Sequence, residues 1–445
     1  MKNTDLGYRY DYLYVPKSKL QNIAEKTLKS SLTFEKPDGT TLRAYKEDST
    51  HIRVPRENFT PVDLFYMPFE IEDQSPNTFP KVSVALTFDL RDSVQHLAKD
   101  ALVNKGNGVL SLSCGKGKTV VSLHAWAALG VPAVVVVPTK DLAYQWKTRI
   151  EEHTSVGEED IGWLSGHPDS WDWQKPISIA TVHAMAAASD DIPDHIRRHW
   201  GVIIFDEVHR LGAPYFNRAA SVCVGRRWGL SATPFRKDGM DALYQSHIGG
   251  VLYQNLEHDS IPTVKFVRTG INLDNVNPRT LTDYSGEINI PKLYTWLSKN
   301  PRRNQIIRQI LTETRDAGRI CLALSERVGH VKELHEYFPN DSGVIHGKVK
   351  GEDREAVLRD NKIVLAITQL ARDGLDRSDL NTVLITMPFT DRGRFEQIIG
   401  RAQRSADPFI FILEDDIEIC RKMCHKLRSH LRSLKYPFGS TEEFR

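Results

Sequence analysis

Short, largely apolar runs alternate with stretches of helical length through most of this 445-residue chain. In the first half, the runs are Gly108–Leu112, Ala133–Val137, Ile177–Ala180, Val202–Phe205 and Arg227–Leu230. A strand that is apolar on both faces belongs in a parallel sheet, because helices cover both sides of such a sheet. The alternation therefore predicts an α/β domain over residues 86–258.

The same alternation resumes in the second half. Its runs are Val264–Val267, Ile320–Leu324, Gly343–Ile345, Ile363–Ile367 and Thr382–Thr386. They predict a second α/β domain over residues 259–445, and two such domains suit the length of the chain. Residues 415–434 are expected to form an amphipathic helix with a basic outer face. This face either lies along a duplex or is simply solvated.

The first 85 residues follow a different pattern. Four tyrosines alternate along an expected strand: Tyr8, Tyr10, Tyr12 and Tyr14. Pro37–Gly39 is a strong turn signal, and residues 17–30 have helical character. These features predict a small α+β accessory module that contacts DNA. The tyrosines either stack on bases or form the buried face of a small sheet.

Composition narrows the class of protein. A net charge of +2 disfavours a passive basic protein that coats nucleic acid. A motor needs only a local positive track, which this net charge allows. The N-terminus is not a signal peptide, and no apolar run is long enough to cross a bilayer. Five scattered cysteines indicate reduced thiols in an intracellular protein. Cys420 and Cys424 share an apolar helix face, which favours a core stripe over a metal site.

A glycine-rich loop follows the first apolar run. It contains Gly115, Lys116, Gly117, Lys118 and Thr119, and a helix is expected to run from there to about Leu129. A strand, such a loop and a helix form the context of a phosphate-binding loop, in which backbone N–H groups surround the phosphates. Lys118 would reach the β- and γ-phosphates, and Thr119 would supply a hydroxyl to Mg²⁺. The strict pattern has glycine where this chain has Leu112, so a flexible turn is the alternative for the loop alone.

Two adjacent acids end another apolar run. Ile203–Phe205 leads directly into Asp206 and Glu207. A parallel strand delivers such carboxylates to the edge of the sheet where ligands bind. Asp206 would hold Mg²⁺, and Glu207 would orient and deprotonate the attacking water. An acidic pair elsewhere is usually solvated surface, but the phosphate loop upstream favours the functional interpretation.

With these motifs, the chain resembles superfamily 2 helicases from Leu90 to Arg404. The segment from Leu112 to Thr119 is similar to the branch of the xeroderma pigmentosum group B helicase, and to branch-migrating helicases of large phages. The resemblance implies two tandem RecA-like domains, with ATP and Mg²⁺ as cofactors. It also implies that Gln95 contacts adenine, with an ordinary exposed helical glutamine as the alternative.

Further roles follow from the resemblance. Nucleic-acid backbone contacts are implied for Pro138, Thr139, Thr181, Ser325 and Thr368. Coupling of hydrolysis to domain movement is implied for His209, Ser231 and Thr233. The local alternative for either Thr139 or Thr181 is a helix N-cap, and for the serine–threonine pair it is a turn.

In the second domain, Gly374 and Asp376 match a motif that faces the ribose and the domain cleft. The stretch Gln397–Arg404 matches another motif of the family, in which Gln397 belongs to the catalytic set. Arg401 and Arg404 lie on one helix face, from which both guanidinium groups can act as arginine fingers on the γ-phosphate. Their alternative is a pair of surface arginines bonded to acids.

The expected function is therefore ATP-driven movement on single-stranded, forked or branched DNA, with unwinding or remodelling in recombination, repair or replication. The alternatives are translocation on duplex DNA without strand separation and an RNA helicase. Outside the motor class they are a nucleotide switch and a passive nucleic-acid-binding protein. We expect a monomer in the cytoplasm, or in the host cytoplasm if a phage encodes it, with no membrane partner. Trp171 and Trp173 either wedge against bases or pack under a loop.

Overall fold

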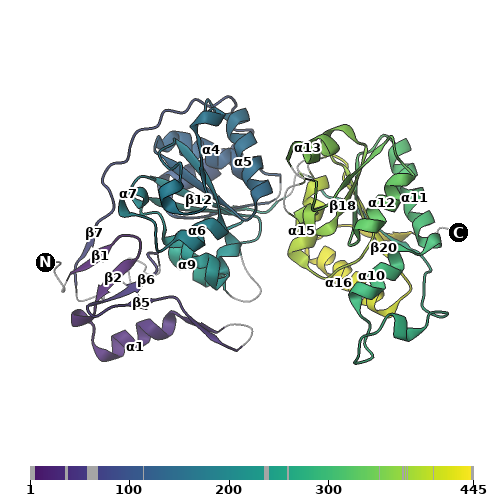
Figure 1. Cartoon of the computed structure of the whole chain (residues 1–445), viewed down its shortest axis with the longest axis horizontal. Helices are drawn as coiled ribbons and strands as arrows, with labels where there is room; N and C mark the ends of the chain where they lie inside the picture. Colours follow the sequence, from purple (N-terminus) through teal and green to yellow (C-terminus); the bar gives the residue numbers. More distant parts are fainter. Residues whose placement is uncertain are drawn as a thin grey trace. The chain divides into compact units, whose positions relative to one another are not determined.

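The computed structural model describes residues 6–35, 39–57, 69–113, 115–234, 240–257, 260–349, 351–372, 375, 377, 379–403 and 405–441. The chain divides into two compact units, Met1–Leu256 and Glu257–Arg445. Each unit contains a seven-stranded sheet, and the first also carries a smaller N-terminal sheet (Figure 1). This is the predicted fold class: two parallel-sheet domains and a small α+β module.

The large sheet of the first unit is parallel throughout, in the order β10-β11-β9-β12-β13-β8-β14. Its strands are β8 (Gly108–Leu112), β9 (Ala133–Val137), β10 (Ile161–Leu164), β11 (Ile177–Thr181), β12 (Val202–Asp206), β13 (Arg226–Ser231) and β14 (Val251–Asn255). The five apolar runs of the sequence are the central strands of this sheet. Because those strands are buried on both faces, their side chains do not alternate between apolar and polar.

Helices cover both faces of this sheet (Figure 1). They are α3 (Ser93–Lys105), α4 (Lys118–Leu129), α5 (Lys140–His153), α6 (Val182–Ala188), α7 (Asp194–Arg197), α8 (Pro214–Asn217) and α9 (Asp241–Ile248). One core packs α3, α4 and α5 against the sheet, and the other packs α6, α7 and α9 against the opposite face. Trp171 is buried in the second core, which supports packing rather than a wedge against bases.

The second unit repeats the design, with strand order β17-β18-β16-β19-β20-β15-β21 and all pairs parallel. Its strands are β15 (Thr263–Arg268), β16 (Cys321–Ser325), β17 (Ser342–Ile345), β18 (Ile363–Ile367), β19 (Thr382–Ile385), β20 (Phe409–Glu414) and β21 (Phe438–Thr441). Its helices are α10 (Ile290–Ser298), α11 (Pro301–Asp316), α12 (Val328–Glu336), α13 (Gly351–Asp360), α14 (Thr368–Arg372), α15 (Arg392–Ala402) and α16 (Glu418–Ser433). Cys420 and Cys424 on α16 are buried in apolar cores, as the core interpretation predicts.

The N-terminal module is a five-stranded sheet, β5-β6-β2-β1-β7, with α1 beside it. Its elements are β1 (Gly7–Arg9), β2 (Leu13–Pro16), α1 (Asn22–Ser31), β3 (Thr33–Glu35), β4 (Thr41–Arg43), β5 (Lys46–Glu47), β6 (His51–Val54) and β7 (Ile71–Asp73). The turn predicted at residues 37–39 falls largely outside the described residues, but β3 and β4 pair antiparallel across it.

The expectation of one tyrosine-bearing strand is wrong, because the chain reverses between β1 and β2. Tyr8 therefore pairs with Tyr14 across a hairpin, and their rings stack with centroids 4.2 Å apart. Tyr10 donates its hydroxyl to Asp194, and the ring of Tyr12 meets His247 edge-on. The tyrosines thus pack within the module and against the large sheet's domain, which favours the structural alternative.

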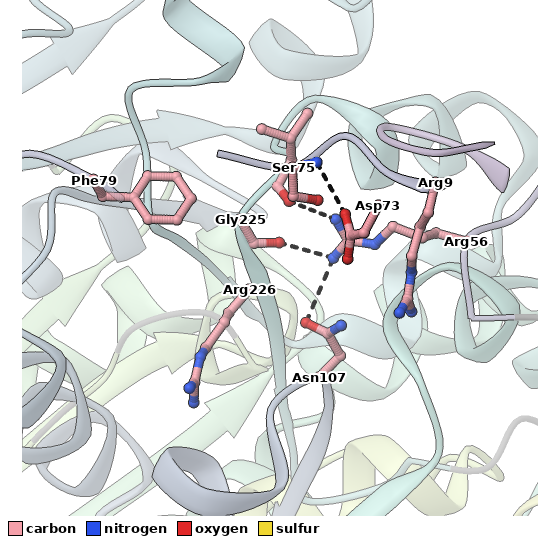
Figure 2. A pocket seen from close by; sticks show the side chains of 9 residues that line it. Arg9, Arg56, Asp73, Ser75, Phe79, Asn107, Gly225 and Arg226 are labelled. Atoms are coloured by element: carbon pink, nitrogen blue, oxygen red, sulfur yellow. Dashed lines mark hydrogen bonds between the residues drawn. The ribbon is translucent and has the colours of Figure 1, made fainter. Parts of the chain in front are cut away.

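Buried polar groups attach the module to the base of the large sheet. Arg56 is 4% exposed and donates to the carbonyl oxygens of Val224 and Gly225, at 2.7 and 2.8 Å (Figure 2). Glu57 accepts from Arg56 at 3.1 Å and from Asn107 at 2.9 Å. Because each polar group has a partner, the module can be fixed through a buried interface without unpaired charge.

Candidate functional site

The carboxyl ends of parallel strands share one edge of a sheet, so the predicted site residues of the first unit converge there. The phosphate loop follows β8, the acidic pair ends β12, and Ser231 ends β13. Pro138 and Thr139 follow β9, and Thr181 ends β11. The fold therefore gathers these groups from five strands at a single edge.

The phosphate loop depends on left-handed glycines. Gly115 and Gly117 have φ angles of 84° and 79°, and Gly117 is the N-cap of α4. Lys118 begins that helix and donates from Nζ to the carbonyl oxygen of Leu112 at 3.1 Å. The free N–H groups of a helix start attract anions, and the lysine lies within the same loop. Lys116 is buried, Thr119 is half-buried, and Cys114 lies outside the described residues.

Gln95 lies beside the phosphate loop and forms a hydrogen bond with it. Its Nε2 donates to the carbonyl oxygen of Lys116 at 3.1 Å, and its Oε1 accepts from the backbone N–H of Arg91 at 2.8 Å. It is only 4% exposed, so it is not the ordinary exposed glutamine of the alternative. A methyl group at Gly117 would lie 2.5 Å from Nε2, which shows how closely the amide fits the loop.

Asp206 is oriented by two donors. Trp146, buried on α5, donates its indole N–H to Oδ2 at 2.9 Å, and the backbone N–H of Glu207 donates to Oδ1 at 2.9 Å. Burial raises the pKa of Asp206 above its usual value, the negative charge of Glu207 raises it further, and Lys118 opposes both. A cation bound at this carboxylate would relieve the same repulsion.

The donor set fits Mg²⁺ held together with a nucleotide. Glu207 has the left-handed φ of 49°, and its Oε2 is buried without a hydrogen-bond partner. Within the described ranges, no cluster of three or more His, Cys, Asp or Glu side chains could hold a metal by itself. Mg²⁺ usually takes one or two carboxylates and completes its shell with water and substrate phosphates. Asp206 and the hydroxyl of Thr119 suit that pattern.

A polar chain links the acidic pair to the end of β13. His209 places Nδ1 3.3 Å from Oε2 of Glu207 and 3.2 Å from the hydroxyl of Ser231. The same hydroxyl accepts from the backbone N–H of Thr233 at 3.0 Å. All three residues predicted to couple hydrolysis to movement therefore lie in one connected group beside Glu207.

The two threonines of the first unit that were predicted to touch nucleic acid both cap helices. Thr139 accepts from the N–H of Leu142 at 3.3 Å at the start of α5, and Thr181 accepts from that of Ala184 at 3.2 Å at the start of α6. Pro138 is buried beside the first cap. The N-cap alternative is thus correct for both side chains, and a backbone contact through the exposed ends of the helices remains compatible with it.

In the second unit, Ser325 ends β16 and Thr368 directly follows the neighbouring strand β18, but each is only 1% exposed. Nε2 of His330 lies 3.1 Å from the side-chain oxygen of Asn304, so Nδ1 accepts the hydroxyl hydrogen of Ser325 at 2.9 Å. Burial, followed by the charge of Arg303, lowers the pKa of His330 to about 3. The Ser325 hydroxyl is therefore hydrogen-bonded inside the second unit.

Helix α15 carries the remaining predicted residues. Gln397 is buried, its Oε1 lacks a hydrogen-bond partner, and Arg401 is half-buried one turn further along. Three predicted residues lie outside the described residues: Gly374, Asp376 and Arg404.

The contact between Trp146 and Asp206 was missed from the sequence. Trp146 lies on the buried face of α5, where its indole meets a side chain from another element. That partner comes from β12, which lies next to β9 in the sheet, and strand order is not readable from local periodicity.

Comparison with known proteins finds two matching family models. Residues 87–236 match the family described as type III restriction enzyme, res subunit, and residues 302–406 match the helicase conserved C-terminal domain. A putative ATP-dependent RNA helicase of Acanthamoeba polyphaga mimivirus is 26% identical over 96% of this chain and 85% of its own length. The DNA 3'-5' helicase XPB of Mycobacterium tuberculosis is 37% identical over 37% of this chain, but this region spans only 30% of that protein.

A solved structure shares the fold. Dbp5 of S. cerevisiae, bound to RNA and ADP BeF3, aligns with a TM-score of 0.57 and 13% identity, over 78% of this chain and 90% of that chain. Among the residues that the structure describes, none of the helices combines the length and apolar character needed to cross a membrane.

Proposed function

We propose that the chain, which is similar to XPB helicases and to putative helicases of large viruses, is an ATP-hydrolysing superfamily 2 helicase that moves on DNA and remodels forked or branched duplexes. The observation that carries the ATP site is the shared sheet edge, where Lys118, Asp206 and Glu207 come together. The XPB relative is named as a DNA helicase, which supports DNA as the partner.

In the first unit, the loop from Gly115 to Thr119 binds the phosphates, and Gln95 positions the loop beneath the base. Lys118 turns from the Leu112 carbonyl oxygen to the β- and γ-phosphates, where its charge stabilises the charge that develops in the transition state. Asp206 and Thr119 hold Mg²⁺, which neutralises phosphate charge when bound.

The proton of the attacking water goes to Glu207. Its Oε2 forms no hydrogen bond, although Nδ1 of His209 lies 3.3 Å away, and we propose that it accepts from that water. The neighbouring His209 and Ser231 then respond to the change of charge on this carboxylate, which makes them suitable for coupling hydrolysis to movement.

From the second unit we propose that Gln397, Arg401 and Arg404 act on the same triphosphate, with Gly374 and Asp376 at the ribose. Two guanidinium groups stabilise the charge on the γ-phosphate only while the triphosphate is intact. Closure is then favoured by ATP and lost on hydrolysis, so alternate closing and opening can step a bound strand. Pro138, Thr139, Thr181, Ser325 and Thr368 mark the backbone-contact segments, and the N-terminal module adds a further DNA contact.

The test is ATP hydrolysis by the full chain with single-stranded, blunt duplex, forked and four-way DNA and with single-stranded RNA. We expect the strongest stimulation from forked or four-way DNA. Stimulation by blunt duplex alone would instead indicate translocation without strand separation. An absence of stimulation by any nucleic acid would leave a nucleotide switch or a passive binder as the better account.

An RNA helicase is the second candidate, because the mimivirus relative bears that name. The same series of substrates decides between them, since stimulation by RNA alone would exclude the DNA assignment.

For the cell, we propose a monomer in the cytoplasm, or in the host cytoplasm if a phage encodes the protein. Sedimentation of the full chain with and without DNA tests the monomer.

A further inference from the structure

A cavity of about 420 Å³ lies in the second unit, between α10 and the loop that follows β16. Its lining includes Leu281, Lys292, Thr295, Trp296, Lys299 and Arg327. We propose that this cavity, called here the α10 pocket, binds one unpaired nucleotide of the DNA strand. The base would lie on Trp296, and the flanking phosphates would lie on the three cations. The identity of the strand as DNA rests on the proposed function.

The pocket stands beside the edge at which the second unit is expected to meet nucleic acid. Arg327 comes two residues after Ser325, the last residue of β16. Ser325 is in register with Ile367 on β18, directly before Thr368. Because Ser325 and Thr368 are buried, they offer little side-chain surface to a strand. The α10 pocket offers exposed basic and aromatic side chains beside them.

The positive charge of the pocket is only partly offset, because the carboxylate of Asp283 interacts electrostatically with Lys292. In the described parts of the chain, Lys292, Lys299 and Arg327 form no ion pair, and none of the residues that line the pocket is acidic. Lys292 donates to the carbonyl oxygen of Thr282 at 2.7 Å. The nearest acid in sequence, Glu326, pairs with Arg394 at 2.7 Å. Cations bonded only to neutral oxygens keep their charge available to an anion such as a phosphodiester.

Arg327 is also held in position. Its guanidinium donates to the hydroxyl of Thr295 at 2.9 Å and to the carbonyl oxygens of Pro291 and Glu326 at 2.5 and 2.9 Å. A cation fixed before binding loses little side-chain entropy when a ligand arrives. The arrangement suits a permanent binding surface better than a freely moving surface arginine does.

Several basic side chains elsewhere are already paired with acids. On α16, Lys422 pairs with Glu418 at 2.6 Å, and Arg428 pairs with Glu414 at 2.6 Å. These pairings favour the solvated alternative for that helix. At the base of the first unit, a cavity of about 190 Å³ contains Arg9 and Arg56 (Figure 2). Both arginines are already bonded to Glu57.

Trp296 provides the specificity for an unpaired base. It packs in part against the buried side chains Leu293 and Leu297, yet it is half-exposed and forms part of the pocket wall. An aromatic face beside a positive groove is the usual arrangement for binding single strands, because bases stack on the ring while cations follow the backbone. A duplex keeps its bases stacked on one another, so a stacking pocket favours an unpaired nucleotide.

The test measures the binding of a fluorescent single-stranded DNA to the full chain by anisotropy, without ATP, at several salt concentrations. Trp296→Ala should raise Kd about 5- to 150-fold, the range measured for loss of one stacked base, with an unchanged salt slope. Lys299→Glu should raise Kd severalfold and reduce the salt slope by about 1. Trp296→Phe should retain most of the affinity, which separates loss of stacking from loss of folding.

The matched control is Lys422→Glu, which makes the same charge change on α16. It should leave Kd within about twofold, because its lysine already pairs with Glu418. The inference is overturned if both pocket variants bind like the wild type, or if the control weakens binding equally. If the binding of blunt duplex depended equally on Trp296, an unpaired occupant would be excluded. Competition by micromolar free mononucleotide would show that the pocket takes a small ligand instead. A preference for RNA would exclude the DNA strand.

This result is separate from the motor assignment, because the binding assay needs no hydrolysis. If DNA stimulates hydrolysis and both pocket variants bind DNA normally, only the proposal for the α10 pocket is contradicted. Pocket-dependent binding without any stimulation would contradict the motor alone. A cross-link from a strand carrying 5-iodouracil to the peptide around Trp296 gives a second readout of occupancy.

Discussion

At the scale of single residues, the hydrogen bond from the Trp146 indole to Asp206 connects two regions of the site. Trp146 lies on α5, whose first turn is capped by Thr139 at the expected nucleic-acid edge. One rigid helix therefore connects that edge with the carboxylate proposed to hold Mg²⁺. A hydrogen bond to a charged group typically contributes about 1.5–3 kcal/mol, which is enough to affect catalysis substantially.

Trp146→Phe removes this donor while keeping most of the ring. We expect ATP hydrolysis to fall about tenfold or more and the affinity for a non-hydrolysable ATP analogue to fall in Mg²⁺ but not in EDTA. Trp126→Phe is the matched control, because that indole donates to the Val131 carbonyl oxygen at 2.7 Å, away from the site. It should lower the melting temperature and leave the nucleotide affinity intact. Equal behaviour of the two variants would show that Trp146 is only structural.

Glu207→Gln should abolish DNA-stimulated hydrolysis while ATP binding persists, because an amide cannot take the proton from water. Lys118→Ala should abolish hydrolysis and weaken ATP binding as well. Arg404→Ala should spare binding and reduce hydrolysis by orders of magnitude. Nucleotide titration by calorimetry, combined with steady-state hydrolysis, separates these three outcomes. Normal turnover in the Glu207 or Lys118 variant would contradict the site assignment.

At the scale of elements, two left-handed glycines bracket α4. Gly117 caps its start with a φ of 79°, and Gly130 ends it with a φ of 60°. Each position is unfavourable for a residue with a Cβ atom, by about 1–2 kcal/mol. Only the first lies in the phosphate loop, so the helix itself provides an experiment with an internal control.

Gly117→Ala should lose nucleotide binding, because its methyl group would meet Gln95 Nε2 as well as strain the loop. Gly130→Ala should cost comparable stability through backbone strain but bind nucleotide normally. Thermal unfolding and nucleotide titration on both variants measure the two effects. Similar loss of nucleotide binding in both would indicate a general defect of α4 rather than a local one in the loop.

At the scale of the whole molecule, the N-terminal module is fixed to the first unit by buried polar contacts. Arg56→Met leaves the carbonyl oxygens of Val224 and Gly225 without this donor, at about 1–3 kcal/mol for each unpaired group. We expect faster hydrogen exchange in β1 and β2 and a lower melting temperature. The control Arg53→Met breaks a partly exposed pair with Asp48 and should cost about 1 kcal/mol or less. Equal destabilisation by both would argue against a buried attachment.

The sequence by itself predicted most strands of the two large sheets and the residues proposed for the ATP site. Runs apolar on both faces indicate buried strands, and β8, β9 and β18 begin and end where the pattern predicts, while the glycines and Lys118 mark the start of α4. The edge strands β10, β14 and β21 and the central strand β20 were missed, whereas the run at Gly343–Ile345 predicted the edge strand β17.

Tertiary structure decided the contacts between distant segments. The reversal after Arg9 turned an apparent tyrosine strand into a hairpin that docks on the first unit. Strand order brought Trp146 to Asp206, and packing against His330 turned the Ser325 hydroxyl inward. Periodicity reports which face of an element is buried, because burial acts on each element separately. The partner that covers this face depends on the order in which strands assemble, and local sequence does not encode that order.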